Sequence, residues 1–229
     1  MNVQILHLIE GAKAARGLTV IIDVFRAFSV EAYFFAKGAN AICPVGDIEI
    51  ARRLKSEFPE AILAGERHGK ILPGFDVGNS PADIMSMDTS GKLVIHTTSA
   101  GTQGIANAIH ADEVLGGCLL NARATADYIR RSGANEVSLV CMGLEAMAPA
   151  DEDTLCANYI KSILEGTHID IASEIEKLKY TTGAKFFDAT QNDVFPQNDF
   201  FMCTAVDKFD FIMRMQTEDG KNYMKKHRS

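Results

Sequence analysis

Residues 61–81, AILAGERHGKILPGFDVGNSP, contain the pattern that decides the fold of this chain. The first four residues are apolar and predict a short buried strand. The segment from Gly65 to Pro81 then holds four glycines and two prolines, which predict a loop leaving a strand end, without further strand or helix. Ser80–Pro81 predicts the start of a helix, with serine as N-cap and proline at the first helical position. Strand, loop and helix in this order form the repeating unit of an α/β protein.

The same unit recurs on both sides of this segment. Strands are expected at residues 3–8, 18–24, 41–45, 61–64, 93–97, 113–116 and 137–142, and helices at residues 28–37, 47–58, 101–109, 122–131, 151–164 and 200–206. This alternation predicts a three-layer α/β/α fold with a mostly parallel or mixed central sheet. We expect residues 1–229 to form one domain that is less regular from about residue 167, with a frayed basic end at residues 225–228.

The composition limits the partners of the protein. A hydrophobic content of 47% is enough for a core, and a net charge of −7 disfavours binding to nucleic acid. The five cysteines are odd in number and form no CxxC, so we expect reduced core residues. No apolar run is long enough to span a bilayer. These features predict a cytoplasmic protein without a nucleic-acid or membrane partner, and they leave a homo-oligomer open.

Polar side chains follow four of the expected strands at their carboxyl ends. Open α/β sheets bind ligands beyond these ends, so the groups are expected to converge around one cleft. They are Asp23 and Arg26 after residues 18–24; Glu66 and Arg67 after 61–64; Thr97, Thr98, Ser99, Gly101 and Thr102 after 93–97; and Glu145 with Asp151, Glu152 and Asp153 after 137–142.

Two of these groups suit an anionic ligand. Arg26 and Arg67 together can clamp a phosphate or sulfonate, whose oxygens match the planar guanidinium fork. The hydroxyls of residues 97–102, with the free N–H groups of the following helix, predict an anion seat. Ordinary N-capping is the alternative for this segment, although it needs only one hydroxyl.

Several carboxylates supply the hard oxygen ligands that Mg²⁺ prefers. The candidates are Asp23, Glu66, Asp76 and Asp153. A helix cap or a partner for arginine is the simpler role, which we expect for about half of these sites. His68 can move protons from its place in the loop, whereas His96, inside an apolar strand, is expected to be a core residue.

The chain resembles the 2-phosphosulfolactate phosphatase family. The resemblance rests on Asp23-Val-Phe-Arg-Ala27, on Gly65-Glu-Arg-x-Gly69 with Gly74-Phe-Asp-x-Gly-Asn-Ser-Pro81, on Thr97-Thr-Ser-Ala-Gly-Thr102, on Glu152-Asp153, and on Phe195-Pro196 with Asp199 and Cys203. One departure bears on the substrate. Ser99 is followed by Ala100, where some relatives carry a shorter Thr-Thr-Asn-Gly-Thr.

The resemblance implies a Mg²⁺-dependent phosphatase of the kind used in coenzyme M biosynthesis, which converts 2-phosphosulfolactate and water into sulfolactate and phosphate. Asp23, Arg26, Glu66 and Arg67 are the expected catalytic residues, and Asn79, Ser80, Thr97, Thr98, Ser99, Gly101 and Thr102 the expected substrate-binding residues. The nucleophile is either a metal-positioned water or a carboxylate, with Asp23 the first candidate. A phosphatase, isomerase or lyase for another phosphorylated hydroxy acid, or a binding module for such an acid, are the alternatives.

Overall fold

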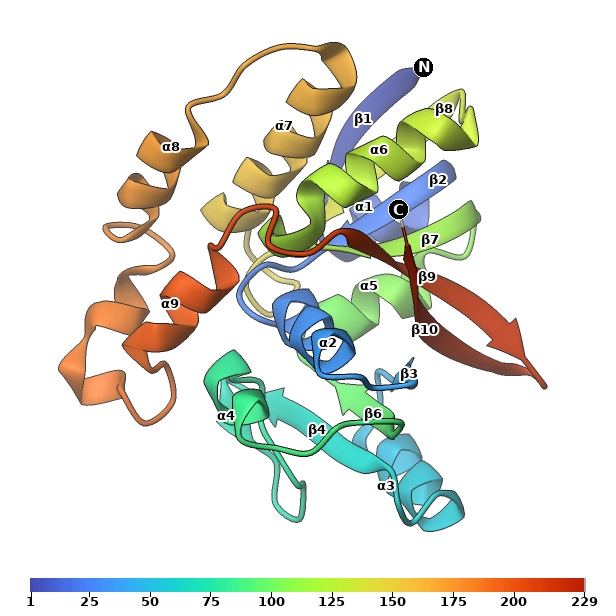
Figure 1. The fold of residues 1–229 in the computed structure, drawn as a ribbon, viewed down its shortest axis with the longest axis vertical. Coiled ribbons are helices and arrows are strands. Elements are labelled where there is room, and N and C mark those ends of the chain that lie inside the picture. The colour runs from blue at the N-terminus through green and yellow to red at the C-terminus, as the bar shows by residue number, and fades with distance from the viewer. Residues whose placement is uncertain (229) are drawn as a thin grey trace.

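The computed structural model describes residues 1–228, which contain a ten-stranded sheet (Figure 1). Its strands are β1 (Asn2–His7), β2 (Gly17–Ile22), β3 (Ala41–Pro44), β4 (Ile62–Arg67), β5 (Lys70–Ile71), β6 (Leu93–Thr97), β7 (Ala111–Gly117), β8 (Glu136–Cys141), β9 (Phe211–Glu218) and β10 (Lys221–Arg228). Their order across the sheet is β1-β8-β2-β7-β9-β10-β3-β6-β4-β5.

Helices connect most of these strands. They are α1 (Leu8–Ala14), α2 (Ala27–Ala36), α3 (Ile48–Glu57), α4 (Pro81–Met85), α5 (Gly101–Asn107), α6 (Ala122–Ser132), α7 (Asp151–Glu165), α8 (Ile171–Leu178) and α9 (Gln197–Cys203), with 3-10 turns η1 (Leu119–Asn121), η2 (Ala184–Phe187) and η3 (Ala189–Gln191). Local chemistry sets several ends. The Asp47 carboxylate caps α3 by accepting the N–H groups of Glu49 and Ile50, and α7 ends at Gly166 in the left-handed region. The α/β class expected from the sequence is confirmed.

The sheet consists of two parallel groups joined by an antiparallel hairpin. Strands β1, β8, β2 and β7 are parallel to one another, and so are β3, β6 and β4. The β9–β10 hairpin lies between the groups and pairs antiparallel with β7 on one side and β3 on the other, so the groups run in opposite directions along the ladder. Because the sheet twists strongly, β2 and β4 nevertheless end on the same side of the molecule, the left in Figure 1.

The frayed basic end expected at residues 225–228 is wrong, because these residues belong to β10. Most side chains of β10 are exposed or half-buried, and Met224 is its only fully buried one, so the strand lacks an apolar pattern. The turn does carry a signal. Asp219 and Gly220 both adopt left-handed backbone, with φ of 49° and 73°, as Asp-Gly hairpin turns do.

Other differences are local. The loop expected from residue 65 begins later, since β4 continues to Arg67 and turns through His68 and Gly69 into the two-residue strand β5. The helix expected at residues 200–206 lies at Gln197–Cys203, and α1 and α8 were not foreseen. All five cysteines are free and buried, as expected. Among residues 1–228, no helix is both long and apolar enough to cross a membrane.

Candidate active site

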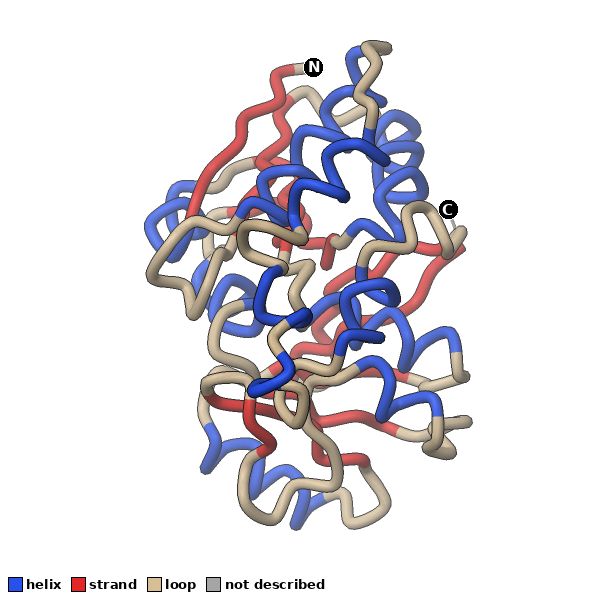
Figure 2. Tube along the Cα trace, turned by 90° about the vertical axis from the view of Figure 1, so that its left-hand side faces the viewer, coloured by secondary structure: helices blue, strands red, loops and turns tan. Residues whose placement is uncertain are grey.

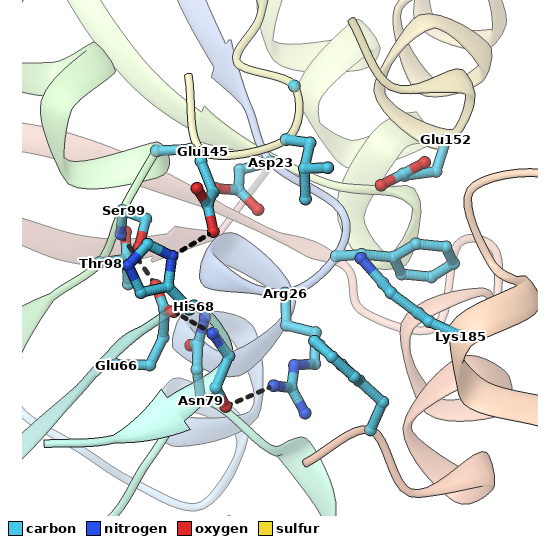
Figure 3. Close-up of a pocket in the computed structure, with 16 residues that line it drawn as sticks. Asp23, Arg26, Glu66, His68, Asn79, Thr98, Ser99, Glu145, Glu152 and Lys185 are labelled. Carbon is cyan, nitrogen blue, oxygen red and sulfur yellow. Dashed lines mark hydrogen bonds and ion pairs between the residues drawn. The ribbon is translucent and has the colours of Figure 1, made fainter. Parts of the chain in front are cut away.

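A cavity of about 300 Å³ lies where β2 and β4 end. Figure 2 faces this side of the molecule, where loops and short helices cover the strand ends. Of the residues expected at the site, those that line the cavity are Asp23, Arg26, Glu66, Asn79, Thr98, Ser99, Glu145 and Glu152 (Figure 3). The prediction from strand ends thus found residues from both parallel groups of strands, although it assumes that all strands run in one direction.

Two nearly buried carboxylates, Asp23 and Glu66, form one wall of the cavity, with exposures of 5% and 6%. Asp23 Oδ1 accepts the Ala27 N–H at 3.0 Å. The two oxygens of Glu66 accept the N–H groups of Ser99 at 2.8 Å and of Gly69 at 2.7 Å. The pKa of Asp23 is raised to about 7, mainly by burial and in part by the charge of Glu66, while the hydrogen bond from the Ala27 N–H opposes the shift. A nearby cation is therefore needed for Asp23 and Glu66 to be fully ionised at the same time.

The start of α5 differs from the expected anion seat. The N–H of Ser99 is taken by Glu66, and that of Thr102 by the Thr98 hydroxyl at 3.3 Å. A hydrogen bond from the Gly101 N–H also lowers the pKa of Asp23, and a Cβ on Gly101 would lie 3.0 Å from Asp23 Oδ2. These amides hold the protein's own carboxylates in place. The buried Ser99 Oγ has no hydrogen-bond partner among residues 1–228 and is available to a ligand.

Arg26 reaches the cavity, but its guanidinium is already engaged. Nη1 donates to Asp199 Oδ2 at 2.7 Å and to the Val194 carbonyl at 3.0 Å, and Nη2 donates to the Gly69 carbonyl at 3.2 Å. The Arg26–Asp199 pair is almost completely buried. Arg26 therefore mainly holds the start of α2 against the C-terminal segment. Its engaged guanidinium is poorly suited to bind a substrate anion.

Arg67 does not line the cavity, contrary to expectation. Its guanidinium donates to the Gly46 carbonyl at 3.2 Å and to Thr97 Oγ1 at 3.1 Å. Successive side chains of a strand point to opposite faces, so Arg67 lies on the other face of β4 from Glu66. Thr97, its partner, is likewise outside the cavity.

Two of the four expected metal ligands also lie elsewhere. Asp76 Oδ2 accepts the Leu63 N–H at 2.8 Å, near the start of β4. Asp153 holds the loops after β2 and β8 together, because its two oxygens accept the N–H groups of Val24 and Gly143, each at 2.8 Å. Neither lines the cavity, and within residues 1–228 no group of three or more His, Cys, Asp or Glu side chains is arranged so that it could hold a metal ion. Asp23 and Glu66 remain as candidates.

Asn79 is held by a buried chain of polar groups. Its Oδ1 lies 3.3 Å from His96 Nε2, and His96 Nδ1 lies 2.9 Å from Glu31 Oε1. His96 is fully buried, as expected of a core residue. Three expected substrate-binding residues, Ser80, Gly101 and Thr102, do not line the cavity, and the Ser80 hydroxyl donates to Asp199 at 2.9 Å.

Glu152, which the sequence placed among the groups at this edge of the sheet, lines the cavity, and so does Lys185, which the sequence did not foresee. Glu152 opens α7 and accepts a hydrogen bond from the Thr182 hydroxyl, while burial raises its pKa. Lys185 comes from η2, and burial lowers its pKa. Glu152 carried a signal through its place in the acidic cluster at residues 151–153, whereas Lys185 follows no strand. At the cavity edge, His68 Nδ1 pairs with Glu145 Oε1 at 2.7 Å.

Asp153→Asn is expected to lower the free energy of unfolding by about 1–3 kcal/mol, because one amide oxygen cannot accept both buried N–H groups. Urea unfolding measures this change. Asp151→Asn, which alters an exposed carboxylate in the same helical turn, is the matched control and should have little effect. Equal stability of the two variants would show that Asp153 does not hold the loops together.

Comparison with known proteins gives one consistent result. The family model described as 2-phosphosulpholactate phosphatase matches residues 3–218. A probable 2-phosphosulfolactate phosphatase of Bacillus subtilis (strain 168) is 35% identical over 211 residues, 91% of this chain and 90% of its own length. Another, of Caldanaerobacter subterraneus subsp. tengcongensis, is 32% identical over 212 residues, 86% of this chain and 87% of its own. The chain therefore belongs to the 2-phosphosulfolactate phosphatase family and is a phosphoric monoester hydrolase.

Proposed function

We propose that this enzyme hydrolyses 2-phosphosulfolactate to sulfolactate and phosphate, with Mg²⁺ held by Asp23 and Glu66. The names of the similar proteins supply the substrate. The cation is inferred from the carboxylate pair itself. Two buried carboxylates on one cavity wall repel each other unless a positive charge lies near them.

The donor set fits magnesium. Mg²⁺ usually binds through one or two carboxylates together with substrate phosphate and water, and it does not need a complete cage of protein ligands. Backbone N–H groups orient Asp23 and Glu66, and each carboxylate oxygen keeps lone pairs for a metal. When bound, Mg²⁺ would act as a Lewis acid on the phosphoryl oxygens.

The chain's own groups then perform the remaining work. The Ser99 hydroxyl and the Asn79 amide, both on the cavity wall, bind phosphoryl oxygens. If Asp23 attacks the phosphorus, the bond to sulfolactate breaks and water then hydrolyses the aspartyl phosphate to release phosphate. If Asp23 instead takes a proton from water, that water attacks the phosphorus directly. In both cases sulfolactate leaves as an alkoxide and takes up a proton from solvent. Both routes need Asp23 ionised, which a neighbouring cation favours.

A phosphate-release assay tests this proposal. With Mg²⁺ we expect turnover of 2-phosphosulfolactate, loss of activity in EDTA, and recovery with excess Mg²⁺. Isopropyl phosphate, which has no second anionic group, should be at least about tenfold poorer in kcat/KM. Full activity in exhaustively chelated protein would sink the metal assignment, and equal rates on both esters would indicate a broad phosphatase.

A further inference from the structure

Lys185 is the most unusual group on the cavity wall. Its side chain extends from the C-terminal segment toward the middle of the cavity, on the opposite side from Thr98 and Ser99 (Figure 3). Within residues 1–228, no ion pair or hydrogen bond engages its Nζ. Three phenyl rings surround it instead, with centroids 5.9 Å (Phe25), 5.5 Å (Phe186) and 5.1 Å (Phe195) away.

These rings hold the ammonium without neutralising it. Ring faces attract a cation and pack against the lysine stem, but they offer no oxygen to its three N–H donors. A largely buried ammonium without an acceptor is costly, and burial lowers the pKa of Lys185 although the charge of Glu152 opposes this shift. An anion in the cavity would supply the missing acceptor.

Neither of the neighbouring charged groups, Arg26 and Glu152, prevents Lys185 from binding an anion or binds it in its place. The donors of Arg26 go to Asp199, Val194 and Gly69. Glu152 lies on the same side of the cavity, but it is bonded to Thr182 and makes no ion pair with Lys185 in the described part of the chain. Among these groups, the ammonium is the cation with free donors.

The cavity therefore has two chemically different ends. Asp23, Glu66 and Ser99 form the end at which a metal and a phosphate would meet, and Lys185 with its rings forms the other. We propose that Lys185 binds the acid group of the substrate that is remote from the phosphate, a sulfonate or carboxylate, and so sets the preference for esters with a second anion. This inference rests on the proposed function for the identity of the substrate.

Lys185→Met removes the charge and keeps a long apolar stem against the rings, so folding should be preserved. We expect the Kd for 3-sulfolactate, measured by calorimetry with Mg²⁺, to rise at least about tenfold. In the phosphatase assay, kcat/KM should fall at least about tenfold more for 2-phosphosulfolactate than for isopropyl phosphate, mainly through KM. Lys185→Arg should recover most of the affinity.

Lys179→Met is the matched control. Lys179 also lies over a ring, that of Phe201 at 5.7 Å, but it pairs with Glu176 and is outside the cavity. It should bind 3-sulfolactate as the wild type does. The fold of every variant is compared by thermal unfolding.

The outcomes separate this inference from the proposed function. If the wild type binds 3-sulfolactate through Lys185 but does not hydrolyse the phosphate ester, the proposed function fails and the inference stands. If hydrolysis occurs and Lys185→Met leaves both the Kd and the preference between esters unchanged, the inference is overturned. A wild type that neither binds 3-sulfolactate nor hydrolyses the ester overturns both.

Discussion

Asp23→Asn is expected to lower kcat for phosphate release on the order of a thousandfold or more. The neutral amide can neither attack phosphorus nor take a proton from water, and it is a weaker ligand for Mg²⁺ than a carboxylate. Its Oδ1 can still accept the Ala27 N–H, so α2 should begin as before. Steady-state kinetics at saturating Mg²⁺ measure the loss.

Asp76→Asn is the control for this substitution. The sequence grouped Asp76 with Asp23 as a metal ligand, but it binds the Leu63 N–H away from the cavity. We expect near wild-type turnover from it. Similar activity losses in both variants would indicate that the site is not built around Asp23.

Asp23→Asn is also expected to change how the free energy of unfolding depends on pH. The pKa of Asp23 is raised to about 7 in the folded protein, so its stabilising contribution is present at low pH. Without divalent cation this contribution is lost as pH rises from about 4 to about 7, because only the unfolded state ionises freely. Asp23→Asn should remove that part of the slope and be relatively more stable at pH 8.

Arg26→Ala is expected to lower the free energy of unfolding by about 3–5 kcal/mol, because it leaves the buried Asp199 carboxylate without its cation. It also removes the donor to the Val194 and Gly69 carbonyls. Urea unfolding followed by circular dichroism measures the change.

Arg52→Ala provides the comparison, since the Arg52–Glu49 pair is solvent-exposed and should contribute less than about 1 kcal/mol. Combining Arg26→Ala with Asp199→Asn should cost less than the sum of the single changes, because each removes the same ion pair. An Arg26→Ala protein as stable as Arg52→Ala would argue against the structural role and return Arg26 to substrate binding.

Most helices and strands within the first 165 residues could be predicted from the sequence, because each of them has its own local signal. Asp47 marks the start of α3, Gly166 follows the end of α7, and apolar runs mark β2 and β8. The strands of the β9–β10 hairpin gave no comparable signal, unlike its Asp-Gly turn, since they are partly exposed and pair with β7 and β3, which lie far away in the sequence.

The site was predictable to the extent that it follows strand ends. Asp23 and Glu66 were found in this way, and the two-residue period of a strand could already have separated Glu66 from Arg67. The role of Asp153 depends on Val24, 129 residues away, and therefore on the tertiary structure. Lys185 could not be predicted as a site residue, because it lies in the 3-10 turn η2, which belongs to no strand–loop–helix unit.

The β9–β10 hairpin also sets the order in which the enzyme can be completed during synthesis. Residues 211–228 leave the ribosome after every strand that they join. Until then, a nascent chain exposes the unpaired edges of β7 and β3, which can pair with other chains. Asp23 follows a strand of one group and Glu66 lies in the other, so pairing of the hairpin with β7 and β3 covers both edges and joins the two halves of the sheet that carry these carboxylates.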